Sequence, residues 1–371
     1  MRRLSALAAL VIAVGALAWP RGAAAGTISL SRPAAATCLT GDGAVYSVQD
    51  GALRPVSGEF MIFPPGAAAF RPLVSEASEG KPGQLLRMYA WSSEPLDSLV
   101  AEIGVVHAEK AEKPLLRARG FRYGELRGSE VWMVLVGIPP WEQPGQYTLT
   151  LTVASGQRSF LRLQPFTLDT RSFSFEKIPL SGSLTDLVTV PDERKTRESQ
   201  VLARVLSTPH ADAVFEHGPL MVPFSGGRRT SGYGDRREYD YSDGTKGNSI
   251  HLGVDIAEPE GTPVPASGRG RVVFAAYRIL TGNTVIVEHL PGLFTVYYHL
   301  SAIRAGVGEV VERGQVIGAV GMTGFATGPH LHWEVEDLGN PVDPDAAAAA
   351  PLLDKTDDFF DIIGAASTEG R

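Results

Sequence analysis

The chain has 371 residues, of which 44% are hydrophobic and 20% are charged, a balance typical of a globular protein and not of a disordered or fibrous one. Its net charge of −7 becomes −10 when residues 1–25 are removed, because that segment holds three of the 34 basic residues and none of the 41 acidic ones. A surface of this sign repels phosphate backbones, which argues against a nucleic-acid partner.

The first 25 residues have the pattern of an export signal. Arginines at 2–3 precede an uncharged apolar run over 4–19, and the alanines at 23–25 supply a small-residue cleavage site. Sixteen residues are short for a bilayer span, which needs about 20. We therefore expect a cleaved signal peptide and an exported protein of the periplasm or cell envelope, with an uncleaved signal-anchored form as the alternative. No later stretch is apolar and long enough to span a membrane.

A single cysteine, Cys38, lies in the poorly patterned segment 26–57. One cysteine cannot form an intramolecular disulfide, and it cannot build a thiolate-rich zinc site. Any bound metal would therefore be held by histidine and carboxylate side chains.

Residues 58–170 are predicted to form an immunoglobulin-like β-sandwich. The stretch "PGQYTLTLTVASG" alternates apolar residues with threonine, which indicates a half-buried antiparallel strand. "EVWMVLVGIPP" indicates a second, more buried strand and "SFLRLQPFTL" a third, with Gly and Pro between them. Only His107 of the eight histidines lies here, so the segment has no apparent catalytic residues.

Residues 171–217 are expected to be a linker with one amphipathic helix at 191–208 that packs on a neighbouring domain. Pro191 suits a first helical position, and acidic residues follow it early. Residues 218–345 then change to short β-rich segments with frequent glycine, such as "NTVIVEHL" and "LFTVYYHL". The tail at 346–371 is expected to be a loose cap or partly disordered.

Two histidines one residue apart stand in "GPHLHWEV", at 330 and 332. In a helix they would point about 200° apart, whereas in a strand they point the same way. The alternation of Trp333 and Val335 favours a strand with both imidazoles on one face.

Two further stretches carry the same kind of side chain. His251 and Asp255 in "HLGVD" share a face if the chain is extended, and His299 ends the predicted strand "LFTVYYHL". A catalytic zinc takes three protein ligands and keeps one position open. Spacing alone does not decide which three of the five candidates bind metal: His251, Asp255, His299, His330 and His332.

"HLGVD", "YYHLS" and "TGFATGPHLHWEV", preceded by "TSGYGDRR", together resemble the LytM/lysostaphin-type zinc metallopeptidases over about residues 219–345. The resemblance implies a compact antiparallel β-fold (the duplicated-hybrid-motif fold) with an open groove. It implies a zinc-dependent endopeptidase that hydrolyses peptide stems or cross-links of bacterial peptidoglycan. It also implies that His251, Asp255 and His332 bind one Zn²⁺, and that His299 and His330 handle the proton and the developing oxyanion.

Several alternatives stay open. A non-catalytic family member could bind wall material and activate another hydrolase, although such relatives usually lack a metal ligand. The sandwich could target the enzyme or cover the groove, and protein regulators could act on it. Glu334 could orient a metal ligand or be a solvated strand-end acid. The remaining candidates are the arginines that could meet anionic muropeptides or only favour solubility, Arg228, Arg229, Arg236 and Arg237, and the tyrosines that could line the groove, Tyr239 and Tyr241.

Overall fold

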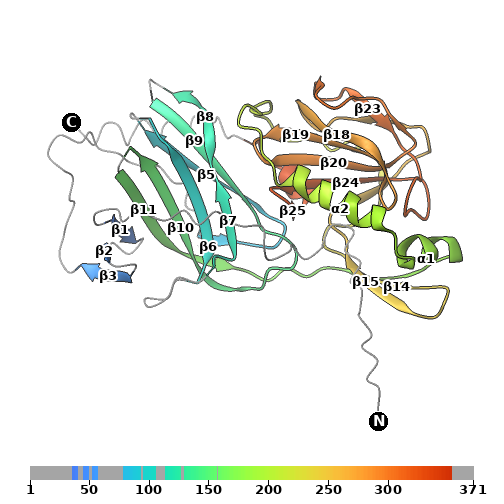
Figure 1. Ribbon diagram of the computed structural model, residues 1–371, viewed down its shortest axis with the longest axis horizontal. Helices are drawn as coiled ribbons and strands as arrows, with labels where there is room; N and C mark the ends of the chain where they lie inside the picture. Colours follow the sequence, from blue (N-terminus) through green and yellow to red (C-terminus); the bar gives the residue numbers. More distant parts are fainter. Residues whose placement is uncertain are drawn as a thin grey trace, which may run out of the picture.

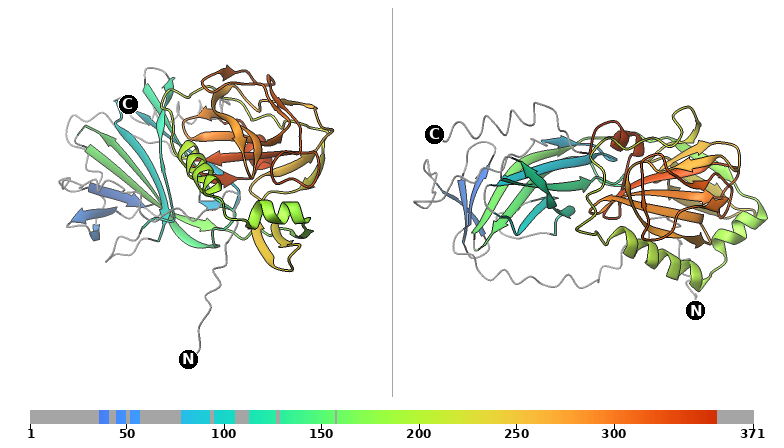
Figure 2. Two further views of the ribbon diagram at one scale, coloured as in Figure 1. Left: turned by 45° about the vertical axis from the view of Figure 1, so that its right-hand side comes forward. Right: turned by 90° about the horizontal axis from the view of Figure 1, so that it is seen from above.

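The computed structural model describes residues 36–40, 45–49, 52–56, 78–92, 95–105, 113–126, 129–156 and 158–352. The predicted signal segment lies outside these residues, as does the tail beyond residue 352. The mainly β architecture predicted from the sequence is confirmed, because antiparallel sheets dominate and helices are few (Figures 1 and 2). No helix among the described residues is long and apolar enough to cross a membrane.

The amino-terminal part of the chain forms two sheets packed face to face. The smaller sheet has the order β5-β9-β8, and the larger has the order β3-β2-β1-β11-β10-β6-β7 with β4 beside β11. Pairing is antiparallel except where β11 meets β1 and β4. The strands are β1 Ala36–Thr40, β2 Val45–Gln49, β3 Ala52–Val56, β4 Glu79–Gly80, β5 Leu85–Ser92, β6 Ser98–Gly104, β7 Leu116–Arg119, β8 Phe121–Leu126, β9 Ser129–Gly137, β10 Gly145–Ser155 and β11 Arg158–Leu168.

The core of this sandwich follows the alternation seen in the sequence. Leu149, Leu151 and Val153 of β10 are buried against Met88 of β5 and Val134 of β9. The threonines between them lie on the other face of β10, as a strand period of two requires. The immunoglobulin-like topology of residues 58–170 stays a prediction.

Strand β9 is buried on both faces, which explains its nearly continuous apolar run. Val134 and Val136 point into the sandwich, whereas Met133 and Leu135 join a second core shared with the carboxy-terminal domain. A strand covered on both sides loses the alternation of apolar and polar residues. The two domains are therefore joined by packed apolar surface and not only by the linker.

The connector between the domains contains three elements: β12 Phe175–Pro179, α1 Gly182–Thr189 and α2 Glu193–Leu206. The predicted helix at 191–208 corresponds to α2, which begins after the N-cap Asp192, so Pro191 precedes the cap. Leu202 and Leu206 of α2 pack on the large sheet of the following domain (Figure 1).

The carboxy-terminal domain is built on an eight-stranded sheet of order β13-β16-β24-β20-β19-β18-β22, with β25 beside β24. Two three-stranded sheets, β17-β23-β21 and β12-β14-β15, adjoin it. The elements are β13 Arg228–Ser231, β14 Arg236–Asp240, β15 Lys246–Ile250, β16 Val254–Ala257, β17 Pro263–Pro265, β18 Gly270–Arg278, β19 Gly282–Leu290, β20 Leu293–Leu300, β21 Ala302–Ile303, β22 Val310–Val311, β23 Val316–Ala319, β24 Leu331–Asp337, β25 Asn340–Val342 and α3 Pro344–Ala348.

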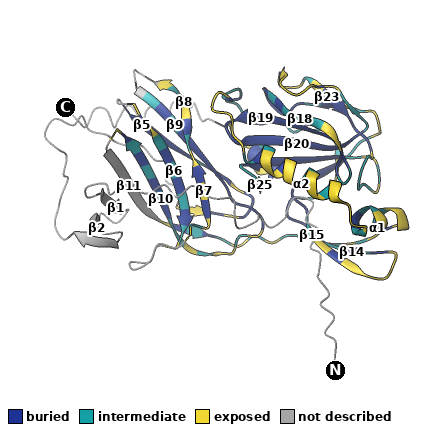
Figure 3. Ribbon diagram, in the orientation of Figure 1, coloured by how far each residue is buried: buried dark blue, intermediate teal, exposed yellow. Residues whose placement is uncertain are grey.

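The central strands β20 and β24 are buried along their whole length (Figure 3). Leu331, Trp333 and Val335 of β24 face the main core, as predicted. The opposite face carries His332 and Glu334, on the side where Tyr298 of β20 stacks on the His332 ring. Ala347 and Leu352 are also buried, so the start of the predicted loose tail packs on the domain.

Candidate metal centre and active-site groove

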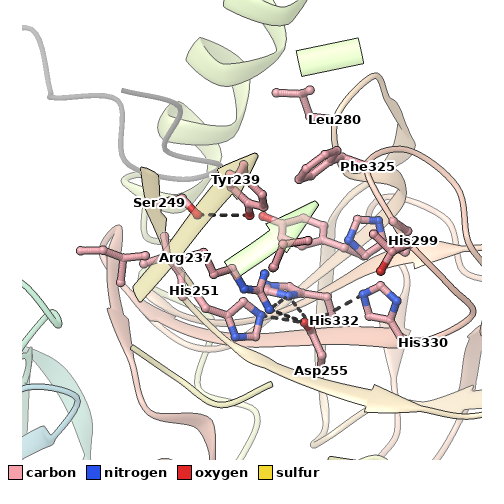
Figure 4. A pocket seen from close by; sticks show the side chains of 16 residues that line it. Arg237, Tyr239, Ser249, His251, Asp255, Leu280, His299, Phe325, His330 and His332 are labelled. Atoms are coloured by element: carbon pink, nitrogen blue, oxygen red, sulfur yellow. Dashed lines mark hydrogen bonds and ion pairs between the residues drawn. The ribbon is translucent and has the colours of Figure 1, made fainter. Parts of the chain in front are cut away.

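Three side chains from two neighbouring strands and the loop before them meet at one point. Asp255 of β16 is the register partner of His332 of β24, which places the two side by side. His251 precedes β16 and reaches the same point (Figure 4). His251 Nε2 lies 3.0 Å from Asp255 Oδ1 and 2.9 Å from His332 Nδ1, and His332 Nδ1 lies 2.7 Å from Asp255 Oδ1.

Each imidazole of this triangle is held by a hydrogen bond at the ring nitrogen that faces away from the triangle. His251 Nδ1 is 2.7 Å from the carbonyl oxygen of Gly232, and His332 Nε2 is 2.8 Å from Glu334 Oε1. A hydrogen bond of this kind fixes the tautomer and the orientation of a ligating histidine. One nitrogen of each ring is therefore free to point at Asp255.

The residues fit a zinc ion. His251, Asp255 and His332 are buried, and each offers one ligand atom within 4.8 Å of the others. Ligands at zinc–ligand distances of about 2.1 Å in tetrahedral geometry lie roughly 3.4 Å apart, more than in the triangle. Two imidazole nitrogens and a carboxylate are a donor set typical of zinc. This cluster could bind a metal ion, and it consists of the three residues that the resemblance implies as ligands.

The three groups shift each other's acidity. Burial alone would raise the pKa of Asp255, but His251 and His332 hold it well below its usual range. Burial lowers the pKa of His251. Burial also acts to lower the pKa of His332, but the hydrogen bonds that its ring donates to Asp255 and Glu334 raise it to about 9. These shifts favour an ionised Asp255 next to a protonated His332.

Two further imidazoles lie next to the triangle. His299 Nδ1 is 2.8 Å from the carbonyl oxygen of Thr323, and His330 Nδ1 is 2.8 Å from that of Gly328. The two ring centroids are 4.8 Å apart, and His330 Nε2 is 3.7 Å from Asp255 Oδ1. Burial, together with the neighbouring histidines, lowers the pKa of His299 to about 3. His299 is therefore a neutral imidazole at neutral pH.

The backbone at His299 departs from the regular strand that the sequence suggested. Its φ of 60° lies in the left-handed region, which a residue with a side chain seldom adopts. In a regular strand His299 would share a face with Tyr297, whose ring lies in the main core. The left-handed turn lets its ring instead lie 6.1 Å from the His332 ring. Such strain clusters at functional sites.

The triangle and the two imidazoles open into a groove of about 100 Å³. Tyr239 and Phe325 meet edge to face on its wall, with ring centroids 5.4 Å apart. Leu280 lies beside Phe325 (Figure 4), and Ile178 of the connector strand β12 completes the apolar wall. Tyr241 is instead buried against Leu180 and Val188, where it packs locally.

Of the four arginines flagged in the sequence, one lies in the groove. Arg237 Nη2 donates to Asp255 Oδ2 at 2.7 Å. Arg236 donates to the carbonyl oxygen of Pro140 and stacks on Phe173, away from the groove. Arg229 pairs with Asp345 at the surface, and Arg228 is exposed. Sequence reasoning named Arg237 as a candidate but missed its pairing with Asp255, because the spacing of the two residues does not indicate a contact.

The remaining histidines have other neighbours. His210 contacts the buried Glu288, and His289 is buried beside Thr295. His217 contacts Tyr123 of the amino-terminal domain. His107 lies outside the described residues.

A buried triangle of two histidines and one aspartate, with two more imidazoles beside it in a groove, defines a metallohydrolase-type centre on a β-fold. Residues 249–344 match the sequence model of the family described as Peptidase family M23. This match includes "HLGVD", "YYHLS" and "TGFATGPHLHWEV", and it confirms the resemblance seen in these motifs.

Two similar proteins carry functional names. The DD-carboxypeptidase/endopeptidase Mpg of Neisseria meningitidis is 45% identical over 109 residues, which cover 29% of this chain and 25% of that protein. The peptidoglycan DD-endopeptidase ShyA of Vibrio cholerae is 47% identical over 98 residues, which cover 26% of this chain and 23% of that protein. The chain thus spans about a quarter of the length of these relatives.

Among solved structures, a putative peptidase M23 from Pseudomonas aeruginosa is 25% identical. The alignment covers 72% of this chain and 94% of that one, with a TM-score of 0.43.

Proposed function

We propose that this chain is an exported, zinc-dependent endopeptidase that hydrolyses peptide bonds in bacterial peptidoglycan. The observation that carries the proposal is the geometry of five side chains in one groove. Three of them offer ligand atoms to a single ion, and two more hold their free ring nitrogens beside it. The name of one relative, peptidoglycan DD-endopeptidase ShyA, supports the substrate class.

In this proposal His251, Asp255 and His332 hold the zinc. When bound, zinc would polarise a carbonyl and lower the pKa of a water molecule to about 7. The chain's own residues then perform the positioning and the proton transfer. The buried triangle excludes bulk water from the ligand side, and the groove holds the peptide against it.

His299 and His330 are assigned the acid–base and oxyanion roles. His299 Nδ1 is engaged by the Thr323 carbonyl oxygen, so its Nε2 would accept a proton from the attacking water and return it to the leaving amine. His330 Nδ1 is engaged by the Gly328 carbonyl oxygen, which leaves Nε2 to interact with the carbonyl oxygen of the scissile bond. The aromatic wall of Tyr239 and Phe325 would contact the apolar parts of the peptide.

The compartment is also a proposal. The export pattern of residues 1–25 agrees with a substrate outside the cytoplasm, and the mature balance of acidic over basic residues agrees with a partner other than nucleic acid. Protein regulators stay an open prediction.

The proposal is tested by incubating purified mature protein with purified sacculi, with and without a chelator, and identifying the released fragments by mass spectrometry. We expect peptide products that disappear with chelator and return when zinc is added. If the protein binds the sacculi but releases no peptides in a metal-dependent way, the result would instead support the non-catalytic wall-binding alternative. The fragment masses would also identify the bond that is cleaved.

A further inference from the structure

The metal triangle has an additional partner that lies outside the M23 match. Arg237 Nη2 donates to Asp255 Oδ2 at 2.7 Å, whereas Asp255 Oδ1 faces His251 and His332. The two oxygens of one carboxylate thus have different partners. The Arg237 side chain is only 15% exposed, so solvent does not compete strongly for this contact.

Arg237 is itself held by the connector. Glu176 of β12 and Arg237 of β14 are register partners in a parallel strand pair. Glu176 Oε2 lies 3.6 Å from Arg237 Nε and 3.3 Å from the hydroxyl of Ser231. Ser231 is in turn the register partner of Asp255 in the neighbouring strand pair. The connector strand is therefore linked to the metal triangle through a short chain of polar contacts.

The charge on Arg237 is secure. A guanidinium keeps its proton in proteins, so Arg237 faces Asp255 Oδ2 as a charged donor. A charged donor on Oδ2 fixes the plane of the carboxylate and leaves Oδ1 as the atom directed at the ion. Removing the donor would leave a buried carboxylate oxygen without a partner, which is costly. The carboxylate could then rotate or coordinate through both oxygens.

We infer that Arg237 is a positioning residue that orients Asp255 for metal binding, and that Glu176 of the connector holds Arg237 in place. The connector strand β12 is then a part of the active site and not only a tether between domains. The inference rests on the proposed metal site, but it concerns residues for which no role follows from the M23 match at 249–344.

Two effects of Arg237 oppose each other, and the inference requires one of them to dominate. A guanidinium near a divalent cation repels it, which by itself would weaken binding. Orientation of the ligand strengthens binding, and loss of such an outer partner typically costs 10–100-fold in metal affinity or activity. We expect orientation to dominate because Asp255 is buried and has no other described donor for Oδ2.

The test measures zinc affinity of the full mature chain by competition with a chromophoric chelator. The variants are Arg237→Gln, Arg237→Lys and Glu176→Gln. Arg229→Gln is the matched control, because Arg229 forms an ion pair of similar length with Asp345 at the surface, outside the groove. Arg237→Gln should lower zinc affinity about 10–100-fold. Arg237→Lys should recover part of the loss, Glu176→Gln should show a smaller loss, and Arg229→Gln should match the wild type.

Two further readouts separate positioning from other roles. The visible absorption of the Co²⁺-substituted protein should change in Arg237→Gln, since the ligand field follows the orientation of Asp255. The thermal midpoint of the metal-free protein should change much less than zinc affinity, because a structural role would destabilise the chain without metal as well. On a peptide substrate, kcat should fall with little change in KM.

Unchanged or increased zinc affinity in Arg237→Gln would overturn the inference. A rise in KM with unchanged metal affinity would also overturn it, since Arg237 would then be a substrate contact. Equal losses of zinc affinity in Arg237→Gln and in the Arg229→Gln control would also overturn the inference. These outcomes are independent of the sacculus assay, because zinc affinity and the cobalt spectrum can be measured without any substrate.

Discussion

At the scale of single residues, the site depends on which ring nitrogen each histidine commits to a neighbour. His251 and His299 use Nδ1 for carbonyl oxygens, whereas His332 uses Nε2 for Glu334. The remaining nitrogens converge because these bonds fix the rings. Gly253, inside "HLGVD", permits this approach: a Cβ there would lie 2.3 Å from the carbonyl oxygen of Trp333 and 3.0 Å from His332 Nε2.

The assigned roles of the histidines predict that one substitution removes zinc binding and another removes only turnover. His332→Ala should abolish zinc binding, because it removes one of the three ligand atoms. His299→Ala should retain zinc but lose about 10²–10⁴-fold in kcat, the usual worth of a general acid–base group. Metal analysis and steady-state kinetics of the two variants check this. Equal loss of zinc in both would contradict the division into ligands and acid–base residues.

Glu334 offers a conservative pair of substitutions. Glu334→Gln keeps an oxygen that can accept from His332 Nε2–H, whereas Glu334→Ala leaves this buried N–H without its partner. We expect zinc affinity to fall about 10–100-fold in Glu334→Ala and clearly less in Glu334→Gln. Chelator competition measures both. If the two variants bind zinc equally well, the hydrogen bond does not orient His332.

At the scale of elements, the strands with strong patterns could be predicted and the short ones could not. The alternation in β10 and the two-residue spacing of His330 and His332 follow directly from the strand period. The small sheet β12-β14-β15 could not be foreseen, because the five residues of β12 show no buried face and pair with a strand far along the chain. The groove wall from Ile178 was missed for this reason.

The backbone turn at His299 is a second feature that could not be predicted from the sequence, although the strand that contains it could. The sequence indicates a strand that ends in histidine, and the structure has that strand as β20. The register of β20 against β19 shifts between Tyr297 and Leu300, and this irregularity includes the residue with φ of 60°. A local shift of this kind depends on contacts with distant residues, here the Thr281 and Thr323 carbonyl oxygens. No pattern in the neighbouring sequence predicts this shift.

At the scale of the whole molecule, the amino-terminal sandwich lies against the carboxy-terminal domain away from the groove. The groove lining runs from Ile178 to His332 and includes no described residue of 58–170. The domains meet where Met133 and Leu135 join the core of Val335 and Val342. This arrangement favours a rigid support over a cover for the groove, whereas a role in targeting stays open.

The domain contact should make stability depend on pH. Asp337 Oδ2 accepts from the Gly137 N–H at 2.7 Å across the contact, and burial raises the pKa of Asp337 to about 7. Because this pKa is higher in the folded chain than in the unfolded chain, the folded state binds the proton more tightly. The stabilisation is complete below about pH 4 and is lost as pH rises through 7.

Asp337→Asn removes this titration while keeping an oxygen that can accept from Gly137. Its thermal midpoint should fall less than that of the wild type between pH 5 and pH 8, and at pH 8 the variant should be the more stable protein. Circular dichroism melts at a series of pH values measure this. Parallel pH profiles for the two proteins would show that Asp337 does not titrate in this range.

The whole account depends on one coordination geometry, which a crystal structure of the mature chain grown with zinc can test. Anomalous scattering at the zinc edge should place one ion bonded to His251 Nε2, Asp255 Oδ1 and His332 Nδ1, with Arg237 still on Asp255 Oδ2. An ion bound elsewhere, or a site that stays empty at saturating zinc, would contradict the account.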